Sequence, residues 1–389
     1  MIYLDAAATS AARREVVEAM WPYLTGAFGN PSSVHTVGEQ ASRALADAHR
    51  RLARVLGCRP GDIVFTSGGT EADNLAIKGL ALANPRGRHL ITTPIEHEAV
   101  LASVGFLARV HGFEVTMLPV DETGRVDPGD LAAALRDDTT LVSVMYANNE
   151  IGTVQPIADL ADLAHARGAL MHTDAVQAAG WLDLDVARLG VDALSLSGHK
   201  FGTPKGVGAL MVRGRLPLEP VLHGGSQERG RRSGTENVAG AVALAAVADL
   251  AERARPEAVR RATAARDDFV RTVLAEVPDA RLTGPQESRR EAGATPARLP
   301  ALASFVFPGT NGEAVLLELE RRGVVSSSGS ACAAGSTDAS HVLLAIGLPD
   351  EVARTAVRFS WGSEVDADAL GRAARTVAEA VGAVRGLST

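Results

Sequence analysis

The 389-residue chain contains only two cysteines, Cys58 and Cys332, too few for a disulfide framework or a four-thiolate metal site. Long apolar runs are also missing, because the longest, 238–248, is about half of the roughly 20 residues that a membrane span requires. Positive charge is in slight deficit, with 39 Lys and Arg against 46 Asp and Glu and a net charge of −7. These absences exclude a secreted disulfide scaffold, a helical membrane protein and a basic nucleic-acid binder.

Two further absences concern location and metals. The chain begins MIYLDAAATS, without the basic and apolar regions of a signal peptide, so we expect a cytoplasmic protein with reduced thiols. The ten histidines are scattered and show no H-x-x-x-H spacing, so we expect no metal site.

Short β-rich runs alternate with helical patterns between residues 60 and 215, which indicates βαβ units and a mostly parallel sheet. A long helical pattern follows over 255–277, opened by Pro256 at a position typical of a helix start. We therefore predict an α/β protein with a large domain, residues 16–254. A smaller α+β domain comprises residues 1–15 plus 255–389.

Polar and reactive side chains follow five predicted strands, at the sheet edge where α/β proteins bind ligands. A glycine-rich turn and a helix start at 67–71 suit a phosphate, because free N–H groups point out of a helix N-terminus. Asp174 ends a buried strand and Lys200 directly follows another, and a buried charge is costly without a partner. The other polar groups at strand ends are His97, Asn149, Gln177, Ser197 and His199.

Pyridoxal phosphate (PLP) requires this combination of groups. It needs a lysine for covalent attachment, a carboxylate beside its pyridine nitrogen and a phosphate cradle. Lys200, Asp174 and the loop 68–70 would supply them, with Ser197 and His199 adding phosphate contacts. Each signal alone also has an ordinary structural explanation, such as a glycine turn or a helix-capping histidine. Their gathering at one sheet edge favours the cofactor.

The two cysteines lie in different sequence contexts. Cys332 lies among small residues, SGSACAAG, so we expect an exposed and reactive thiol. Cys58 follows a helical pattern and fits a small buried apolar residue.

Motifs over almost the whole chain resemble the PLP-dependent cysteine desulfurases of the NifS/IscS type, within the class V aminotransferase superfamily. The matching segments are YLDAAAT, GNPSSVH, FTSGGTEADNLAIKG, EHEAV, NNEIGTVQPI, HTDAVQ, SLSGHKFGTPKGVGAL, RSGTEN, SSSGSAC and RFSWG. The resemblance implies PLP-dependent transferase fold type I and a homodimer. It also implies conversion of L-cysteine to L-alanine, with the sulfur carried as a persulfide to a protein acceptor.

The resemblance also assigns the central residues. Lys200 is the lysine that binds the cofactor covalently, Asp174 is the partner of the pyridinium nitrogen, and Cys332 is the thiol nucleophile. His97 stacks on the ring and handles protons. Gln177 lies near the 3-hydroxyl of the ring.

By the same resemblance, Asn149 contacts cofactor and substrate, and Arg358 binds the substrate carboxylate. The phosphate region is assigned Gly69, Thr70, Ser197, His199 and, from the neighbouring subunit, Thr235.

The chain departs from the housekeeping members in two places. Residues 201–204 read Phe-Gly-Thr-Pro where a Tyr-Gly-Pro run is usual, and the chain stops soon after its last helix, without their longer tail. The sulfur acceptor is therefore open between cluster assembly, tRNA thiolation and a specialised route.

Three other functions stay open. A selenocysteine lyase and an aminotransferase or kynureninase-like enzyme would use the same fold, and a non-catalytic sulfur-relay scaffold would retain it. Cys332 favours sulfur transfer, because transamination needs no protein thiol. Lys200 and Asp174 together argue against the scaffold.

Overall fold

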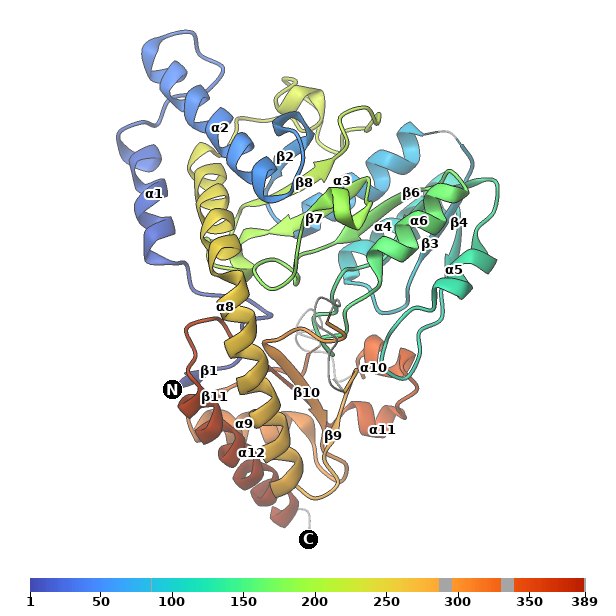
Figure 1. Ribbon diagram of the computed structural model, residues 1–389, viewed down its shortest axis with the longest axis vertical. Helices are drawn as coiled ribbons and strands as arrows, with labels where there is room; N and C mark the ends of the chain where they lie inside the picture. Colours follow the sequence, from blue (N-terminus) through green and yellow to red (C-terminus); the bar gives the residue numbers. More distant parts are fainter. Residues whose placement is uncertain (85, 287–295, 330–338, 388–389) are drawn as a thin grey trace.

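The computed structural model describes residues 1–84, 86–286, 296–329 and 339–387. The strands of its largest sheet are Ile63–Thr66 (β2), His89–Thr92 (β3), Glu114–Met117 (β4), Thr139–Ser143 (β5), Leu170–Asp174 (β6), Ala193–Ser197 (β7) and Gly208–Val212 (β8). They lie in the order β2-β8-β7-β6-β5-β3-β4 (Figure 1). Only β8 runs against its neighbours within this described sheet, so the carboxyl ends of the other strands share one edge.

The sheet separates two apolar cores, because successive side chains of a strand point to opposite faces. Leu90 and Leu141 pack into one core, and their neighbours Ile91 and Val142 pack into the other. Helices Gly69–Ala83 (α3) and Glu98–His111 (α4) pack into the first core. Those that pack into the second include Thr36–Val55 (α2), Pro128–Ala134 (α5), Ile157–Ala166 (α6), Val186–Leu189 (α7) and Val238–Glu276 (α8), while Arg14–Thr25 (α1) adds Val16.

A smaller α+β part lies at the other end of α8 (Figure 1). Its strands are Ile2–Tyr3 (β1), Arg281–Leu282 (β9), Leu302–Val306 (β10), Val324–Val325 (β11) and Ala356–Ser360 (β12), and its helices are Gly312–Arg321 (α9), His341–Ala345 (α10), Asp350–Ala353 (α11) and Ala367–Leu387 (α12). β10 pairs antiparallel with β9 and β12, and β1 pairs parallel with β11. Phe269 of α8 packs into the apolar core of this smaller part, where its ring centroid lies 5.2 Å from that of Phe359.

Helix α8 differs from the sequence-based prediction. The pattern predicted a helix opened by Pro256, but the helix begins at Val238 and continues through this proline. Proline removes one intrahelical hydrogen bond, at a cost of about 3 kcal/mol or more. Ala251 before it and Ala258 after it are both buried, so the helix is packed on each side of the proline. The predicted domain boundary between residues 254 and 255 therefore falls inside a continuous helix, and the division itself stays a prediction.

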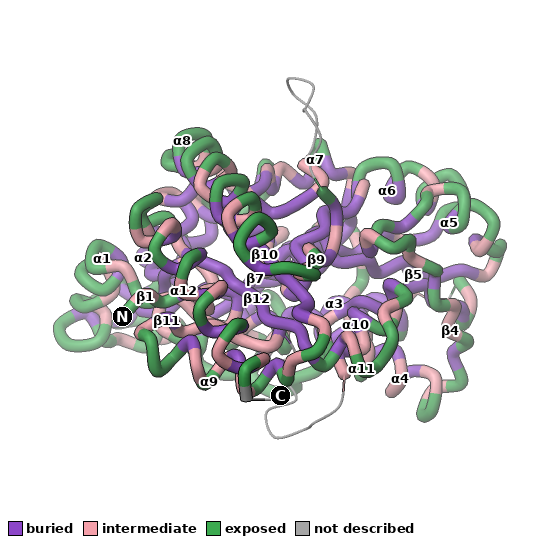
Figure 2. The backbone as a smooth tube through the Cα atoms, turned by 90° about the horizontal axis from the view of Figure 1, so that it is seen from below, coloured by how far each residue is buried: buried purple, intermediate pink, exposed green. Residues whose placement is uncertain are grey.

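The predicted fold class, a mostly parallel α/β sheet with a smaller α+β part, is confirmed. Figure 2 shows buried backbone running through the centre and exposed backbone on the outer helices. In the described part of the chain, every helix is too short or too polar to cross a membrane. The same residues contain no cluster of three or more histidine, cysteine or acidic side chains that would suit a metal ion.

Candidate active site

Residues 5–9, hereafter the N-terminal segment, lie across the sheet edge where the predicted site residues gather. The Ala7 carbonyl oxygen accepts hydrogen bonds from Lys200 Nζ at 2.7 Å and from Gln177 Nε2 at 3.0 Å. Lys200 Nζ also donates to the Ala8 carbonyl at 2.9 Å. Thr9 Oγ1 lies 3.1 Å from His199 Nδ1. The segment thus links three predicted site residues that follow β6 and β7.

The predicted phosphate cradle forms where β2 turns into α3. Gly68 precedes α3 and has no side chain, so it cannot cap the first N–H groups of the helix. A Cβ atom added to Gly69 would lie 2.9 Å from Val176 Cγ2 and 3.3 Å from Ser197 Cβ. Glycine is therefore required at position 69 for the helix start to approach β7. The predicted residues Gly69 and Ser197 are brought together, and Thr70 is exposed at the same helix start.

An ion pair neutralises the acidic residue at this helix start. Glu71 accepts hydrogen bonds from Arg232 Nε at 2.8 Å and from the Ser67 N–H at 2.8 Å. Burial raises the pKa of Glu71, but these hydrogen bonds outweigh burial and hold it below its usual value. Arg232 therefore balances a negative charge that would otherwise repel a phosphate, and it lies three residues from Thr235. Motif reasoning did not identify this pair.

We expect Arg232→Met to weaken cofactor retention by about tenfold, because a hydrogen bond between charged groups is worth about 1.5–3 kcal/mol and Glu71 would lose its partner. Equilibrium dialysis of PLP measures the dissociation constant. Arg322→Met is the matched control, since Arg322 pairs with Glu318 at 2.9 Å with similar exposure of both side chains, on α9. Equal dissociation constants in the two variants would contradict the role of Arg232.

Asp174 is a buried carboxylate at the end of β6. Its Oδ1 accepts a hydrogen bond from the Val176 N–H at 2.9 Å. Burial raises its pKa, while the charges of His97 and Lys200 act in the opposite direction. A cationic ligand group beside Asp174 would stabilise the ionised carboxylate further.

The two predicted site histidines have different hydrogen-bonding roles. His97 caps α4, because its Nδ1 accepts a hydrogen bond from the Ala99 N–H at 3.1 Å, so a neutral ring carries its proton on Nε2. Burial, with the charges of Lys200 and Lys205, lowers the pKa of His199 to about 4. His199 is therefore neutral at pH 7, and it can donate a hydrogen bond to a phosphate oxygen without adding positive charge.

Three buried titratable groups that the sequence analysis did not identify, two carboxyl groups and a histidine, lie near this edge. Glu96 accepts hydrogen bonds from Thr93 Oγ1 at 2.7 Å and from the Met145 N–H at 3.0 Å, and burial raises its pKa to about 8. Burial and the charge of Asp174 raise the pKa of Asp73. His172 lies between two serine hydroxyls, and burial lowers its pKa to about 3.

Arg358 on β12 is buried beside the predicted Asn149. Its Nη1 donates to the Asn149 carbonyl at 2.9 Å and its Nη2 to Asp5 Oδ1 at 2.7 Å. Its Nε is buried and has no hydrogen-bond partner among the described residues. An unpaired guanidinium N–H of this kind suits a carboxylate ligand. Asp5 was not identified from the sequence, although it lies in the YLDAAAT motif.

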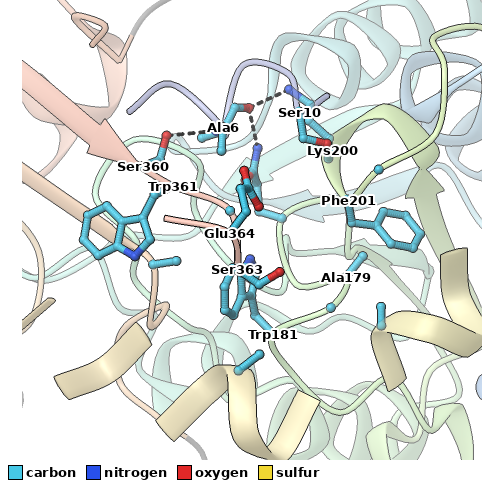
Figure 3. Close-up of a pocket in the computed structure, with 18 of the residues that line it drawn as sticks. Ala6, Ser10, Ala179, Trp181, Lys200, Phe201, Ser360, Trp361, Ser363 and Glu364 are labelled. Carbon is cyan, nitrogen blue, oxygen red and sulfur yellow. Dashed lines mark hydrogen bonds between the residues drawn. The ribbon is translucent and has the colours of Figure 1, made fainter. Parts of the chain in front are cut away.

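A cavity of about 380 Å³ adjoins the Lys200 side of the site (Figure 3). Its walls are formed by the chain at residues 6–13, by α8 and by the loop after β12, with Trp181, Phe201 and Trp361 among the lining side chains. Lys200 and Gln177 line it, whereas Asp174 and His97 are not among its described lining residues. The cavity therefore lies beside the cofactor-binding edge rather than in the phosphate cradle.

The remaining predicted residues have separate outcomes. Thr235 is exposed on the segment before α8, and its predicted reach to a neighbouring subunit stays a prediction. Cys332 lies outside the described residues. Cys58 is half-buried, and burial, with the charges of Asp62 and Asp185, raises its pKa to about 12. A thiol with this pKa is almost fully protonated at pH 7, as expected of a structural cysteine.

These groups together fit a pair of ligands. An uncapped helix start beside Ser197 suits a phosphate, the buried Asp174 suits a cationic ring nitrogen, and Lys200 supplies an amine. Arg358 suits a carboxylate. The sites therefore match a phosphorylated aromatic cofactor and an amino-acid substrate.

Comparison with known proteins gives consistent results. The chain matches the family described as aminotransferase class-V over residues 2–370. A cysteine desulfurase IscS of Dictyoglomus turgidum is 47% identical over 362 residues, which cover 93% of this chain and 89% of that protein. A solved NifS-like protein has a TM-score of 0.89 and 34% identity, over 98% of this chain and 99% of its own. Another solved structure, SspA in complex with cysteine, has a TM-score of 0.78 and 37% identity, over 93% and 99%.

Proposed function

This chain belongs to the aminotransferase class-V family, and from that membership we propose that it is a PLP-dependent cysteine desulfurase. It would convert L-cysteine to L-alanine and hold the sulfur on Cys332 as a persulfide. One observation carries the proposal: the N-terminal segment contacts Lys200, Gln177, His199 and Arg358 along five consecutive residues. The lysine proposed for covalent attachment and the arginine proposed for carboxylate binding therefore both contact this one segment. The relatives named IscS, and the one solved with cysteine, support cysteine as the substrate.

Cofactor binding would use the groups at the sheet edge. Gly69, Thr70, Ser197 and His199 would hold the phosphate, with Thr235 from a neighbouring subunit. Lys200 would bind the cofactor covalently and Asp174 would keep its ring nitrogen protonated, with Gln177 at the 3-hydroxyl and His97 on the ring face. When bound, PLP supplies an electron sink for the bonds at the substrate's α and β carbons.

Substrate binding and sulfur transfer would use the remaining residues. Arg358 holds the α-carboxylate through its unpaired Nε, and Asn149 lies beside it. The Cys332 thiolate attacks the substrate sulfur, so an S–S bond forms as the substrate's Cβ–S bond breaks. The electron pair of the broken bond stays on carbon, which is protonated to the methyl group of alanine. His97, whose neutral ring would carry its proton on Nε2, would exchange protons at the substrate.

A homodimer would complete the site, because Thr235 is exposed in the single chain. Trp21 and Phe28, at and just after α1, are 59% and 71% exposed, which supports a covered face in solution. A reducing cytoplasm would keep Cys332 available, and a protein acceptor would take the sulfur.

The direct test of this function uses the PLP-loaded protein with L-cysteine. We expect alanine, and one extra sulfur atom on the protein, in equal amounts in the first turnover. L-Selenocysteine and an amino donor with a 2-oxo acid, supplied in separate reactions, test the lyase and aminotransferase alternatives. Transamination without sulfur release, or turnover of selenocysteine alone, would contradict the proposal.

A further inference from the structure

His49 on α2 is a buried histidine whose two ring nitrogens both face hydrogen-bond acceptors. Its Nδ1 lies 2.9 Å from the Leu45 carbonyl oxygen, and its Nε2 lies 3.0 Å from Glu228 Oε2. A carbonyl oxygen only accepts, so Nδ1 carries a proton. The contact between Nε2 and Oε2 then requires a second proton, on the ring or on the carboxyl. His49 and Glu228 are therefore joined by a hydrogen bond in either case.

The Glu228 side chain depends on this bond. It is 2% exposed, and its other oxygen, Oε1, is buried with no hydrogen-bond partner among the described residues. A buried carboxyl group is costly unless it is hydrogen-bonded. In the described part of the chain, the bond to His49 is thus the one hydrogen bond that fixes this carboxyl group.

The backbone around Glu228 has an unfavourable conformation. Ser226, Glu228 and Arg229 have φ of +63°, +46° and +59°, in the left-handed region that residues with a Cβ atom rarely adopt. Such a conformation persists only where the surrounding structure enforces it. Residues 226–229, hereafter the strained segment, therefore need an attachment, and the bond from His49 supplies one on α2.

The strained segment leads directly to the arginine that neutralises Glu71. The Arg231 N–H donates to the Glu228 carbonyl at 3.1 Å. The next residue, Arg232, donates to Glu71 Oε1 at 2.8 Å beside the predicted phosphate cradle. Thr235, the proposed phosphate contact of a neighbouring subunit, follows three residues later. The place of Glu228 therefore bears on where Arg232 enters the cradle.

His49 also contacts the strand that leads into the cradle. Its ring meets that of Phe65 on β2 edge to face, with the centroids 4.7 Å apart and an interplanar angle of 74°. β2 ends at Thr66, just before the turn at 67–69 that begins α3. One side chain thus contacts both the strand that enters the cradle and the segment that brings Arg232 to it.

We propose that His49 and Glu228 are positioning residues for the cofactor phosphate. They hold the strained segment against α2, so that Arg232 stays paired with Glu71. This inference rests on the proposed function, because the phosphate belongs to the proposed cofactor. Neither residue is assigned a contact with the phosphate, so both act through Arg232. The expected consequence is a loss of affinity that depends on the phosphate group of the ligand.

PLP and pyridoxal, which lacks the phosphate, separate this role from a general loss of stability. For His49→Leu, we expect the dissociation constant of PLP to rise about fivefold, as expected for the net worth of about one hydrogen bond. The constant for pyridoxal should change less than about twofold, because Lys200 and Asp174 are untouched. Equilibrium dialysis of the full-length protein measures both constants.

Two further variants act on the same bond. His49→Gln keeps an amide N–H that can donate to Glu228, so PLP binding should return to within about twofold of the wild type. Glu228→Met removes the bond from the other side and fills the buried volume with an apolar side chain, so it should match His49→Leu. A His49→Gln variant as weak as His49→Leu would overturn the role of the hydrogen bond.

A double variant tests the route through Arg232. His49→Leu and Arg232→Met would act on the same contact, so their combination should lose about tenfold, no more than Arg232→Met alone. Independent effects would multiply to about fiftyfold. That result would overturn the proposed route.

His165→Leu is the matched control, because it removes another histidine–carboxylate pair. His165 Nε2 lies 2.7 Å from Asp192 Oδ2. Asp192 precedes β7, at the opposite end of that strand from Ser197. This variant should leave the dissociation constants of PLP and pyridoxal unchanged.

The remaining outcomes are distinct. Unchanged PLP binding in His49→Leu and Glu228→Met, or equal weakening of PLP and pyridoxal, overturns the positioning role. Either result leaves the proposed function standing if the wild type prefers PLP to pyridoxal and forms the persulfide. A wild type that binds the two equally refutes the cofactor assignment itself. If His49→Leu does not fold, Glu228→Met decides the question through the same two constants.

Discussion

Replacing Lys200 with alanine is expected to abolish L-cysteine turnover while the chain stays folded. Lys200 supplies both covalent attachment and a proton-transfer group, so turnover should fall by more than about 10³-fold. The fold should survive, because the Ala7 carbonyl retains its hydrogen bond from Gln177 at 3.0 Å. The yellow absorption of the attached cofactor should disappear together with alanine formation.

Lys78→Ala is the control for this variant. Lys78 lies on α3, where its Nζ donates to Asn74 Oδ1 at 2.6 Å, and its removal should leave turnover and absorbance near those of the wild type. Borohydride should fix the cofactor to the peptide that contains Lys200. Alanine release at the wild-type rate by Lys200→Ala would refute the assignment.

Cys332→Ser is the second variant with a large expected effect. A serine hydroxyl is far less nucleophilic than a thiolate, because only the deprotonated sulfur attacks readily. In buffer free of added thiol, we expect cofactor absorbance and cysteine binding to persist while alanine formation falls by more than about 10³-fold. Mass spectrometry after one turnover should find the extra sulfur atom on the wild-type peptide that contains Cys332, and none on the variant.

Cys58→Ser is the control, and it should be near normal. With a pKa of about 12, roughly one Cys58 thiol in 10⁴ is ionised at pH 8. Sulfur found on Cys58, or full activity in Cys332→Ser, would contradict the sulfur-transfer mechanism. The cofactor assignment would be unaffected by that result.

The sequence predicted the alternating part of the fold well but missed β4 and β8. Alternation of short apolar runs with helical patterns indicated β2, β3, β5, β6 and β7, because each buried strand is a continuous apolar run. β8 follows β7 after a short connection, Gly198 to Val207, which is too short for a parallel crossover. The antiparallel direction was therefore available from the spacing, whereas the path of α8 through Pro256 depends on packing from both ends.

Site residues at strand ends could be predicted because chain order places them on one edge. Gly69 and Ser197 follow this rule, and the structure brings them together. The contacts of Asp5 and Glu150 could not be predicted in the same way. Asp5 contacts Arg358 across 353 positions, and Glu150 contacts Ser340 across 190. Motif reasoning locates reactive groups on a known edge, but such contacts depend on how the two parts of the molecule pack.

The contact between Asp5 and Arg358 also orders events during protein synthesis. Residues near the start of the chain pair with β11 and β12, through Ile2 with Val324 and through Asp5 with both Ser360 and Arg358. Residues 7–9 of the N-terminal segment contact residues 177–200, in about the first half of the chain, but Ile2 and Asp5 lack these partners until the ribosome has translated almost the entire chain. Loop closure over such a separation costs entropy and slows folding. A nascent chain that ends before residue 358 can form the parallel sheet, but it cannot yet close the catalytic edge.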